Sequence, residues 1–130
     1  MSIAIGQVVD GKYRIVRLLG QGAMGAVFEG ENTRIKRRVA IKVLPAAVAE
    51  KKDLVDRFER EAQAAGRIGS EHIVDILDLG ELPDGARYLV MEYLEGESLG
   101  DRIKSSVRIP PALLLPMIRQ LLVGLGAAHQ

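Results

Sequence analysis

The chain contains no cysteine among its 130 residues. That absence excludes disulfide bonds, catalysis by a thiolate and zinc sites built on cysteine. A sequence without cysteine fits a reducing compartment, and we expect a cytoplasmic location. Histidine is also scarce, since only His72 and His129 are present. His129 has no second histidine near it in the sequence, so we predict no metal site, and we expect His72 to be structural.

A large excess of one charge is also missing. The 18 lysine and arginine residues nearly balance the 17 acidic residues, and the formal net charge is +1 at pH 7. Nucleic-acid-binding domains usually carry a clustered basic excess, so we expect no nucleic-acid partner. The nearest approach to such a cluster is Arg34, Lys36, Arg37 and Arg38. We interpret it as a solvated loop between strands, with steering of a phosphate-rich ligand as the alternative.

Signal-peptide features and long uninterrupted apolar runs are absent. Residues 1–9 lack both the basic start and the long apolar stretch of a secretory signal. The most apolar segment, Leu113 to Ala128, contains Pro116, Arg119 and Gln120. We interpret it as a core helix, and we expect no membrane segment in this chain.

The composition that is present describes one folded domain. Hydrophobic residues make up 48% of the chain and charged residues 27%, which are the proportions of a globular protein. A chain of this length can bury one core.

The first half of the sequence has the pattern of three strands. Tyr13 to Leu19, Ala26 to Glu31 and Arg38 to Leu44 are short runs rich in apolar or β-branched residues. Short connections join them, which predicts an antiparallel meander.

A helix pattern follows. Apolar residues recur at spacings of three and four, the period of an amphipathic helix. They are Phe58, Ala62, Ala65 and Ile68. We expect this helix to begin near Lys51 or Asp53 and to end by Gly69.

Two further strands are predicted at Ile73 to Gly80 and Arg87 to Tyr93. The Asp-Gly pair of Pro83-Asp84-Gly85 lies between them and is a strong hairpin signal. After Glu95 the pattern becomes helical again. Ser98 is placed to cap a short helix through Lys104, and Pro110-Pro111 opens a longer one.

Gly20 to Val27 reads Gly-Gln-Gly-Ala-Met-Gly-Ala-Val, the pattern G-x-G-x-x-G-x-V. Backbone that approaches a phosphate closely needs residues without a Cβ atom. Taken alone, this pattern also fits a plain glycine-rich hairpin. It also occurs in dinucleotide-binding oxidoreductases, where a helix follows directly. Here a strand pattern follows, which argues against the oxidoreductase.

Lys42 ends the apolar run Val39-Ala40-Ile41-Lys42. A lysine inside an apolar strand is costly unless its charge is paired, although its ammonium could also reach solvent at a strand edge. Glu61 follows Phe58 by three residues, so we expect it to share the core-facing stripe of the helix, with Glu59 and Arg60 pointing elsewhere. Glu61 alone would be an ordinary surface acid, but paired with Lys42 it would position the lysine.

In this order, the glycine pattern and the lysine strand resemble the nucleotide-binding motifs of the protein kinases. Arg57 to Ala62 resembles the start of the family's αC helix, Glu71 to Val74 the turn into the fourth strand, and Tyr88 to Leu94 the fifth strand and hinge. Gln120 to Gln130 resembles the helix before the catalytic loop. The resemblance covers about Tyr13 to Gln130 and is closest to the bacterial serine/threonine kinases.

The resemblance implies an α+β fold. Residues 13–94 would form the ATP-binding N-lobe, a five-stranded antiparallel sheet with one αC-type helix. Residues 1–12 would be an N-terminal extension. Residues 95–130 would contain the exit from the hinge and the first two helices of a truncated C-lobe.

The resemblance also implies a role for individual residues. Lys42 would hold the α- and β-phosphates of ATP and would itself be held by Glu61. The glycine loop would cover the phosphates with Gly20, Gln21, Gly22, Ala23, Met24 and Gly25. Leu19, Val27 and Ala40 would form the apolar roof over the base, and Met91 would be the gatekeeper behind it. The hinge residues Glu92, Tyr93 and Leu94 would bind the adenine edge through the backbone of Glu92 and Leu94.

The family's H-R-D and D-F-G motifs do not occur in the 130 residues. They carry the catalytic aspartate and the Mg²⁺ ligands, which we therefore expect beyond Gln130. The parent protein is expected to transfer the γ-phosphate of ATP to serine or threonine hydroxyls of a protein substrate, and this chain alone to be inactive. The alternative is a truncated or pseudokinase-like binding module. We also expect self-association through the apolar C-terminal helix.

Overall fold

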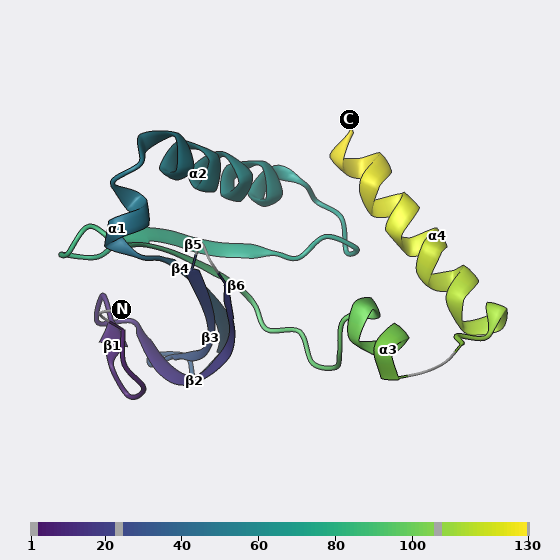
Figure 1. Ribbon diagram of the computed structural model, residues 1–130, viewed down its shortest axis with the longest axis horizontal. Coiled ribbons are helices and arrows are strands. Elements are labelled where there is room, and N and C mark those ends of the chain that lie inside the picture. The colour runs from purple at the N-terminus through teal and green to yellow at the C-terminus, as the bar shows by residue number, and fades with distance from the viewer. Residues whose placement is uncertain (1–2, 23–24, 106–107, 130) are drawn as a thin grey trace. The chain divides into compact units, whose positions relative to one another are not determined.

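The computed structural model describes residues 3–22, 25–105 and 108–129 (Figure 1). Contacts between residues divide the chain into two compact units. The first contains the described residues of Met1–Arg67 and Val74–Tyr93, and the second those of Ile68–Ile73 and Leu94–Gln130.

The first unit is built on an antiparallel sheet with the strand order β1-β2-β3-β4-β6-β5. Its strands are β1 (Val8–Val9), β2 (Tyr13–Gly22), β3 (Gly25–Asn32), β4 (Arg38–Leu44), β5 (Ile76–Glu81) and β6 (Arg87–Glu92). The predicted meander of β2, β3 and β4 is confirmed. The predicted turn between β5 and β6 is also present, since the Gly85 amide donates to the Leu82 carbonyl at 2.9 Å.

The sheet has six strands in the described residues, one more than the sequence predicted. The additional strand is β1, in which Val8 and Val9 lie opposite Arg14 and Tyr13. Two residues are too few to show the alternation that identifies a strand. A one-turn helix, α1 (Ala46–Ala49), was also missed, because four residues are too few to show the period of a helix.

Alternate residues of a strand point to opposite faces of the sheet, and here each face has its own core. On one face, Val39, Ile41 and Val43 of β4 are buried together with Tyr88 and Val90 of β6. The opposite face is covered by α2 (Lys52–Arg67), as Figure 1 shows. The core between that helix and the sheet consists of Leu44, Val55, Phe58, Ala62 and Leu89. The predicted bounds of the helix are confirmed.

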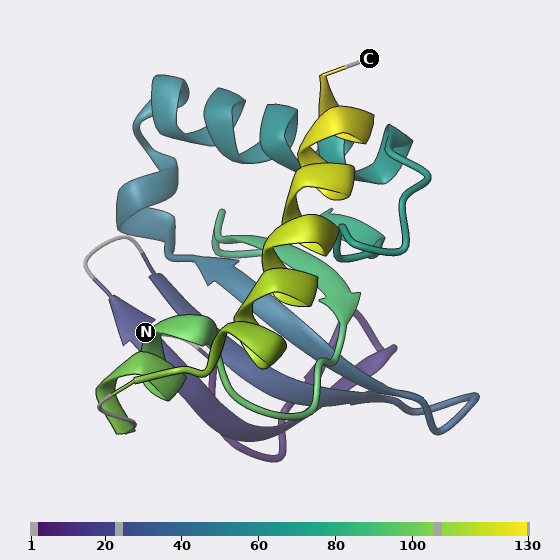
Figure 2. The ribbon, with the colours of Figure 1, turned by 90° about the vertical axis from the view of Figure 1, so that its right-hand side faces the viewer.

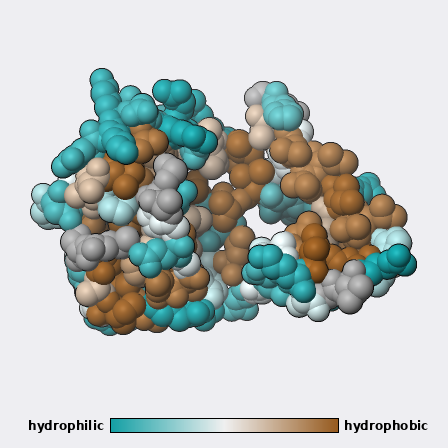
Figure 3. Space-filling view, viewed as in Figure 1, coloured by the Kyte–Doolittle hydropathy of each residue, from teal (hydrophilic) through white to brown (hydrophobic). Residues whose placement is uncertain are grey.

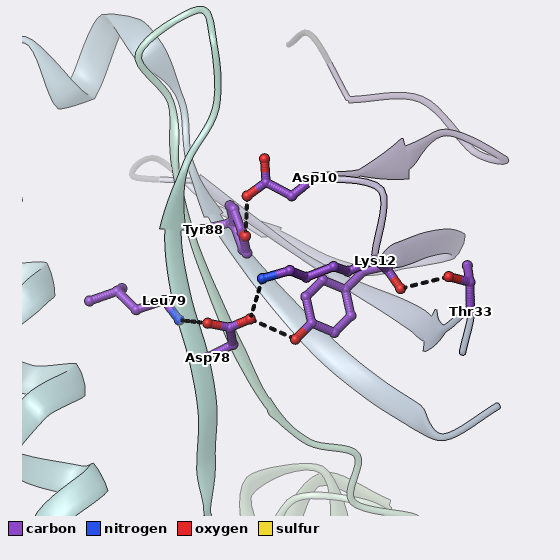
Figure 4. A network of polar contacts seen from close by, with 7 residues as sticks. Asp10, Lys12, Thr33, Asp78, Leu79 and Tyr88 are labelled. Carbon is purple, nitrogen blue, oxygen red and sulfur yellow. Dashed lines mark hydrogen bonds and ion pairs between the residues drawn. The ribbon is translucent and has the colours of Figure 1, made fainter. Parts of the chain in front are cut away.

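Two buried tyrosines connect the start of the chain to β5 and β6 (Figure 4). The Tyr13 hydroxyl donates to the Asp78 carboxylate at 2.7 Å, and the Tyr88 hydroxyl donates to Asp10. Lys12 also pairs with Asp78, at 3.7 Å. The two rings meet edge to face, with centroids 6.3 Å apart. These contacts fix the β1–β2 connection against the sheet.

The connection between β3 and β4 projects from the sheet, as Figure 2 shows. Arg34, Lys36 and Arg37, which lie in this connection, are exposed. Arg38 begins β4 and contacts Glu29, with 3.5 Å between Nε and Oε2. The exposure of the first three agrees with a solvated loop.

The second unit contains α3 (Leu99–Ser105) and α4 (Pro111–Ala128). The predicted cap on α3 is confirmed, since the Asp101 amide donates to the Ser98 hydroxyl at 3.0 Å. Gly124 of α4 packs against the 68–73 segment, because a Cβ atom there would lie 3.3 Å from His72 Cβ and from Ile73 Cδ1.

The large apolar side chains of α4 are mostly exposed, and they form an apolar surface in Figure 3. The exposed ones are Leu113, Leu115, Met117, Ile118, Leu121, Leu122, Val123 and Leu125. In length and composition α4 is also sufficient to cross a membrane. That is weak evidence, because core helices and signal sequences meet the same criterion.

Candidate functional site

A pocket of about 430 Å³ lies in the first unit, between the β2–β3 hairpin, β4 and α2. Its wall includes Gly22 and Gly25 of the hairpin, Lys42 of β4 and Glu61 of α2. Phe58 and Leu44, from the core between the helix and the sheet, also line it. The pocket therefore brings together the glycine run, the strand lysine and the helix glutamate that the sequence singled out.

Lys42 lies on the face of the sheet that α2 covers. It is opposite Val27 on one neighbouring strand and Leu89 on the other. Its Nζ atom is 5.9 Å from the centre of the Phe58 ring, which is within the range of a cation–π contact. The aromatic ring of Phe58 thus contacts the ammonium at the pocket wall, while Lys42 itself remains exposed.

Glu61 is paired within its own helix. Its Oε1 atom lies 3.1 Å from Nε of Arg57, one turn earlier, and 62% of its side chain is exposed. Among the described residues no ion pair joins Glu61 to Lys42. The structure therefore places both predicted partners in one pocket without the predicted pairing.

Glu59 was expected to point away from the core, and that expectation was wrong. Its Oε1 atom lies 3.0 Å from Nη1 of Arg87 on β6, so it fastens α2 to the sheet. The buried stripe of α2 is Val55, Phe58 and Ala62. At roughly 100° per residue, position 59 lies closer to the middle of this stripe than position 61 does. Arg87 also pairs with Glu81, at 3.6 Å.

Three of the residues predicted to surround an adenine base, Val27, Ala40 and Met91, lie on the same face as Lys42. Ala40 is opposite Met91, and Val27 is opposite Lys42. Ala40 is buried and Val27 is half-buried, whereas Leu19 is exposed. Met91 packs against the core formed with α2, beside Leu89.

The hinge residues differ in how they are held. Glu92 exchanges two hydrogen bonds with Asp75, one through its amide and one through its carboxylate. The Tyr93 hydroxyl accepts from Arg17 at 3.0 Å. Leu94 belongs to the second unit and is 66% exposed. Ala23 and Met24, predicted at the loop tip, lie outside the described residues.

Sequence reasoning missed Glu29, a carboxylate on β3 that is only 7% exposed. Arg17 donates to it at 2.9 Å, and this hydrogen bond and the charge of Glu29 raise the pKa of Arg17. An acid between Phe28 and Gly30 in a predicted strand was the available signal.

The pocket suits an anionic ligand. Its wall carries the ammonium of Lys42 and the paired side chains of Arg57 and Glu61, so the charged side chains sum to a positive charge. The space beside the backbone of Gly22 is open, so a ligand can approach it closely. No group of three or more His, Cys, Asp or Glu side chains able to hold a metal occurs in the described part of the chain.

The family model of the protein kinase domain matches residues 13–130. The chain is 43% identical over 122 residues to the serine/threonine-protein kinase pkn2 of Myxococcus xanthus, covering 94% of this chain and 14% of pkn2. It is 38% identical to PrkC of Bacillus subtilis, covering 97% of this chain and 19% of PrkC. The crystal structure of the Mycobacterium tuberculosis PknI kinase domain superimposes with a TM-score of 0.81 at 30% identity. That match covers 100% of this chain and 53% of the PknI chain. The chain thus spans less than a fifth of the two curated relatives.

Proposed function

The chain belongs to the protein kinase family, and we propose that it forms the ATP-binding part of a serine/threonine kinase. In this proposal the protein that contains the chain transfers the γ-phosphate of ATP to serine or threonine hydroxyls of other proteins. The observation that carries it is the pocket in which Lys42, Glu61 and the hairpin glycines converge.

The residues present fit a nucleoside triphosphate. Small-molecule sites typically have volumes of roughly 300–1,000 Å³, and this pocket has about 430 Å³. Gly20 and Gly22 have no neighbour within 4 Å of a built Cβ atom, so the space beside their backbone is open. When bound, ATP supplies the phosphoryl group that is transferred, and Mg²⁺ neutralises its charge. We assign no Mg²⁺ ligand to this chain.

Each residue then has a defined task. The Lys42 ammonium holds phosphate oxygens, and the glycine backbone covers them and excludes water. Glu61 orients Lys42 once it is released from Arg57. Phosphoryl transfer depends mainly on positioning and charge stabilisation, so these residues contribute to the rate without contacting the protein hydroxyl.

The 130-residue chain alone is proposed to be inactive, because it contains neither the H-R-D nor the D-F-G motif. A second candidate function is nucleotide binding without transfer. The observation that favours it is the pairing of Glu61 with Arg57, which leaves Lys42 without its expected carboxylate partner.

The test is phosphotransfer from ATP to a generic protein substrate by the full-length gene product. We expect transfer by the wild type and a loss of about 100-fold or more in Lys42→Met. Lys36→Met is the matched control, since Lys36 is an exposed lysine in the β3–β4 connection. ATP binding without transfer would support the binding module. Transfer at the same measurable rate in wild type and Lys42→Met would contradict both the binding module and the task assigned to Lys42.

A further inference from the structure

The buried carboxylate of Glu29 is held by two arginines. Arg17 Nε lies 2.9 Å from Oε1 of Glu29, and Arg38 Nε lies 3.5 Å from Oε2. A buried carboxylate is unfavourable unless charges and hydrogen bonds compensate it. The side chains of Arg17 and Arg38 are each about half exposed, so the acid is the buried centre of this group.

A β-bulge in β2 places Arg17 beside Glu29. Ile15 is opposite Gly30 and Arg17 is opposite Glu29, so Val16 is an extra residue on β2. In a regular strand, Ile15 and Arg17 would point to the same face, and Ile15 is buried in the core on the far side of the sheet. The bulge turns Arg17 onto the opposite face, the one that carries Ala40 and Lys42.

Both arginines also contact Tyr93. Nη2 of Arg17 donates to the Tyr93 hydroxyl at 3.0 Å, and the guanidinium carbon of Arg38 lies 4.2 Å from the centre of the tyrosine ring. One arginine thus holds the edge of the side chain and the other its face. The group of Arg17, Glu29, Arg38 and Tyr93 is called the tyrosine clamp below.

Tyr93 lies just beyond the residues of β6 that pair with a neighbouring strand. The last pairing between β4 and β6 is Val39 with Glu92, so Tyr93 follows directly after the end of the ladder. Beyond that point, backbone order depends on contacts other than strand pairing. The tyrosine clamp supplies such contacts within the first unit.

We propose that Glu29 is a positioning residue that, through Arg17 and Arg38, fixes Tyr93 and so orders the backbone leaving β6 for base binding. The inference rests on the proposed function for its ligand, because that function assigns the backbone of residues 92–94 to the adenine edge. Ordering the segment before binding lowers the entropy cost of binding. The clamp therefore affects recognition of the base more than recognition of the phosphates.

The test uses the full-length protein and two readouts. The first is hydrogen exchange of a peptide containing residues 92–94, measured without nucleotide. The second is the dissociation constant of adenosine and of ATP. Tyr93→Leu and Arg17→Gln should raise the exchange rate of that peptide and the dissociation constant of adenosine, each by about tenfold.

The variants are chosen to separate positioning from folding. Glu29→Gln removes the negative charge at the centre of the clamp. Tyr93→Phe keeps the ring over Arg38 and loses only the hydroxyl, so its effects on both readouts should be smaller than those of Tyr93→Leu. Arg14→Gln is the matched control: it removes one arginine of β2 that lies opposite Glu31, outside the clamp. It should leave both readouts unchanged. Lys42→Met should raise the dissociation constant of ATP and leave that of adenosine unchanged.

An unchanged exchange rate of the 92–94 peptide in both Tyr93→Leu and Arg17→Gln would overturn the proposal that the clamp orders this segment. Faster exchange with wild-type affinity for adenosine would overturn its role in base recognition. If the wild type binds neither adenosine nor ATP while the variants exchange faster, ordering by the clamp stands and the proposed function fails.

Discussion

At the scale of single residues, Gly25 is the glycine of the loop that the fold requires most strongly. A Cβ atom added there would lie 2.1 Å from the Val43 carbonyl oxygen, and 3.4 Å from Cδ of Pro45. Gly20, in the same motif, has nothing within 4 Å. The motif therefore combines a glycine needed for packing with one that leaves room for a ligand.

Gly25→Ala should lower the free energy of unfolding by about 1–3 kcal/mol, because backbone must move to admit the methyl group. Gly20→Ala is the matched control and should change it by no more than about 0.5 kcal/mol. Urea unfolding of both variants measures the difference. Equal stabilities would show that the β3–β4 contact at Gly25 is looser than this structure has it.

The two buried tyrosines should make stability depend on alkaline pH. Burial and the hydrogen bond to Asp78 raise the pKa of Tyr13 from 10.0 to about 12, and burial and Asp10 raise the pKa of Tyr88 above its ordinary value. A group whose pKa is raised by folding stabilises the fold below its unfolded pKa and loses that contribution as the pH rises. The free energy of unfolding should therefore fall between about pH 10 and 12.

Tyr13→Phe checks this assignment, since it removes one titrating hydroxyl while keeping the buried ring. Urea unfolding at pH 9, 10, 11 and 12 should give a shallower decline for Tyr13→Phe than for wild type. Parallel declines would assign the alkaline loss to other groups.

At the scale of elements, α2 carries two acids with different roles. Glu59 pairs with Arg87, whose side chain is 26% exposed and whose buried Nε has no hydrogen-bond partner in the described residues. Glu61 pairs with Arg57 at the surface. The first pair connects helix and sheet, and the second stays within the helix.

Glu59→Gln should destabilise the protein by about 1–3 kcal/mol, because it weakens a charge-assisted hydrogen bond to a partly buried arginine. Glu61→Gln is the matched control, and an exposed pair within a helix is worth only about 0.3–0.5 kcal/mol. Thermal unfolding of the two variants shows which substitution costs more stability. A larger loss in Glu61→Gln would reverse the roles assigned here.

The Arg57–Glu61 pair should also restrain activity slightly. Arg57→Gln frees Glu61 to approach Lys42, and since the lost pair is worth about 0.3–0.5 kcal/mol, phosphotransfer by the full-length protein should rise about twofold. Arg60→Gln removes the same charge from α2, but adjacent residues of a helix do not face each other. A rise in both variants would point to helix charge instead of Glu61.

Most elements could be predicted from the sequence, since each long element has its own period. The bounds of β4 and the course of α2 follow from β-branched residues and from the spacing of Phe58 and Ala62. The direction of Glu61 could not be predicted, because Glu59 and Glu61 lie on opposite sides of the apolar stripe, and their angular distances from its middle differ only modestly. The bulge at Val16 also gave no sequence signal, so the pairing of Arg17 with Glu29 was missed.

At the scale of the whole molecule, the exposed apolar surface of α4 favours association between copies of the chain. Leu115, Leu121 and Leu122 are 63%, 58% and 61% exposed in the 130-residue chain. Contiguous exposed apolar surface usually promotes association. The balanced net charge of +1 supplies little repulsion between copies to oppose it.

We propose that the 130-residue chain self-associates through α4, and light scattering should give a mass above that of one chain. Leu115→Glu combined with Leu122→Glu should shift the chain toward the monomer, because each placed carboxylate would need to be buried without a partner. Ile35→Glu is the matched control, since Ile35 is 67% exposed but lies in the β3–β4 connection. A monomeric wild type at high concentration would contradict the proposal. An equal shift in the control would show that added negative charge, acting anywhere on the surface, is what separates the copies.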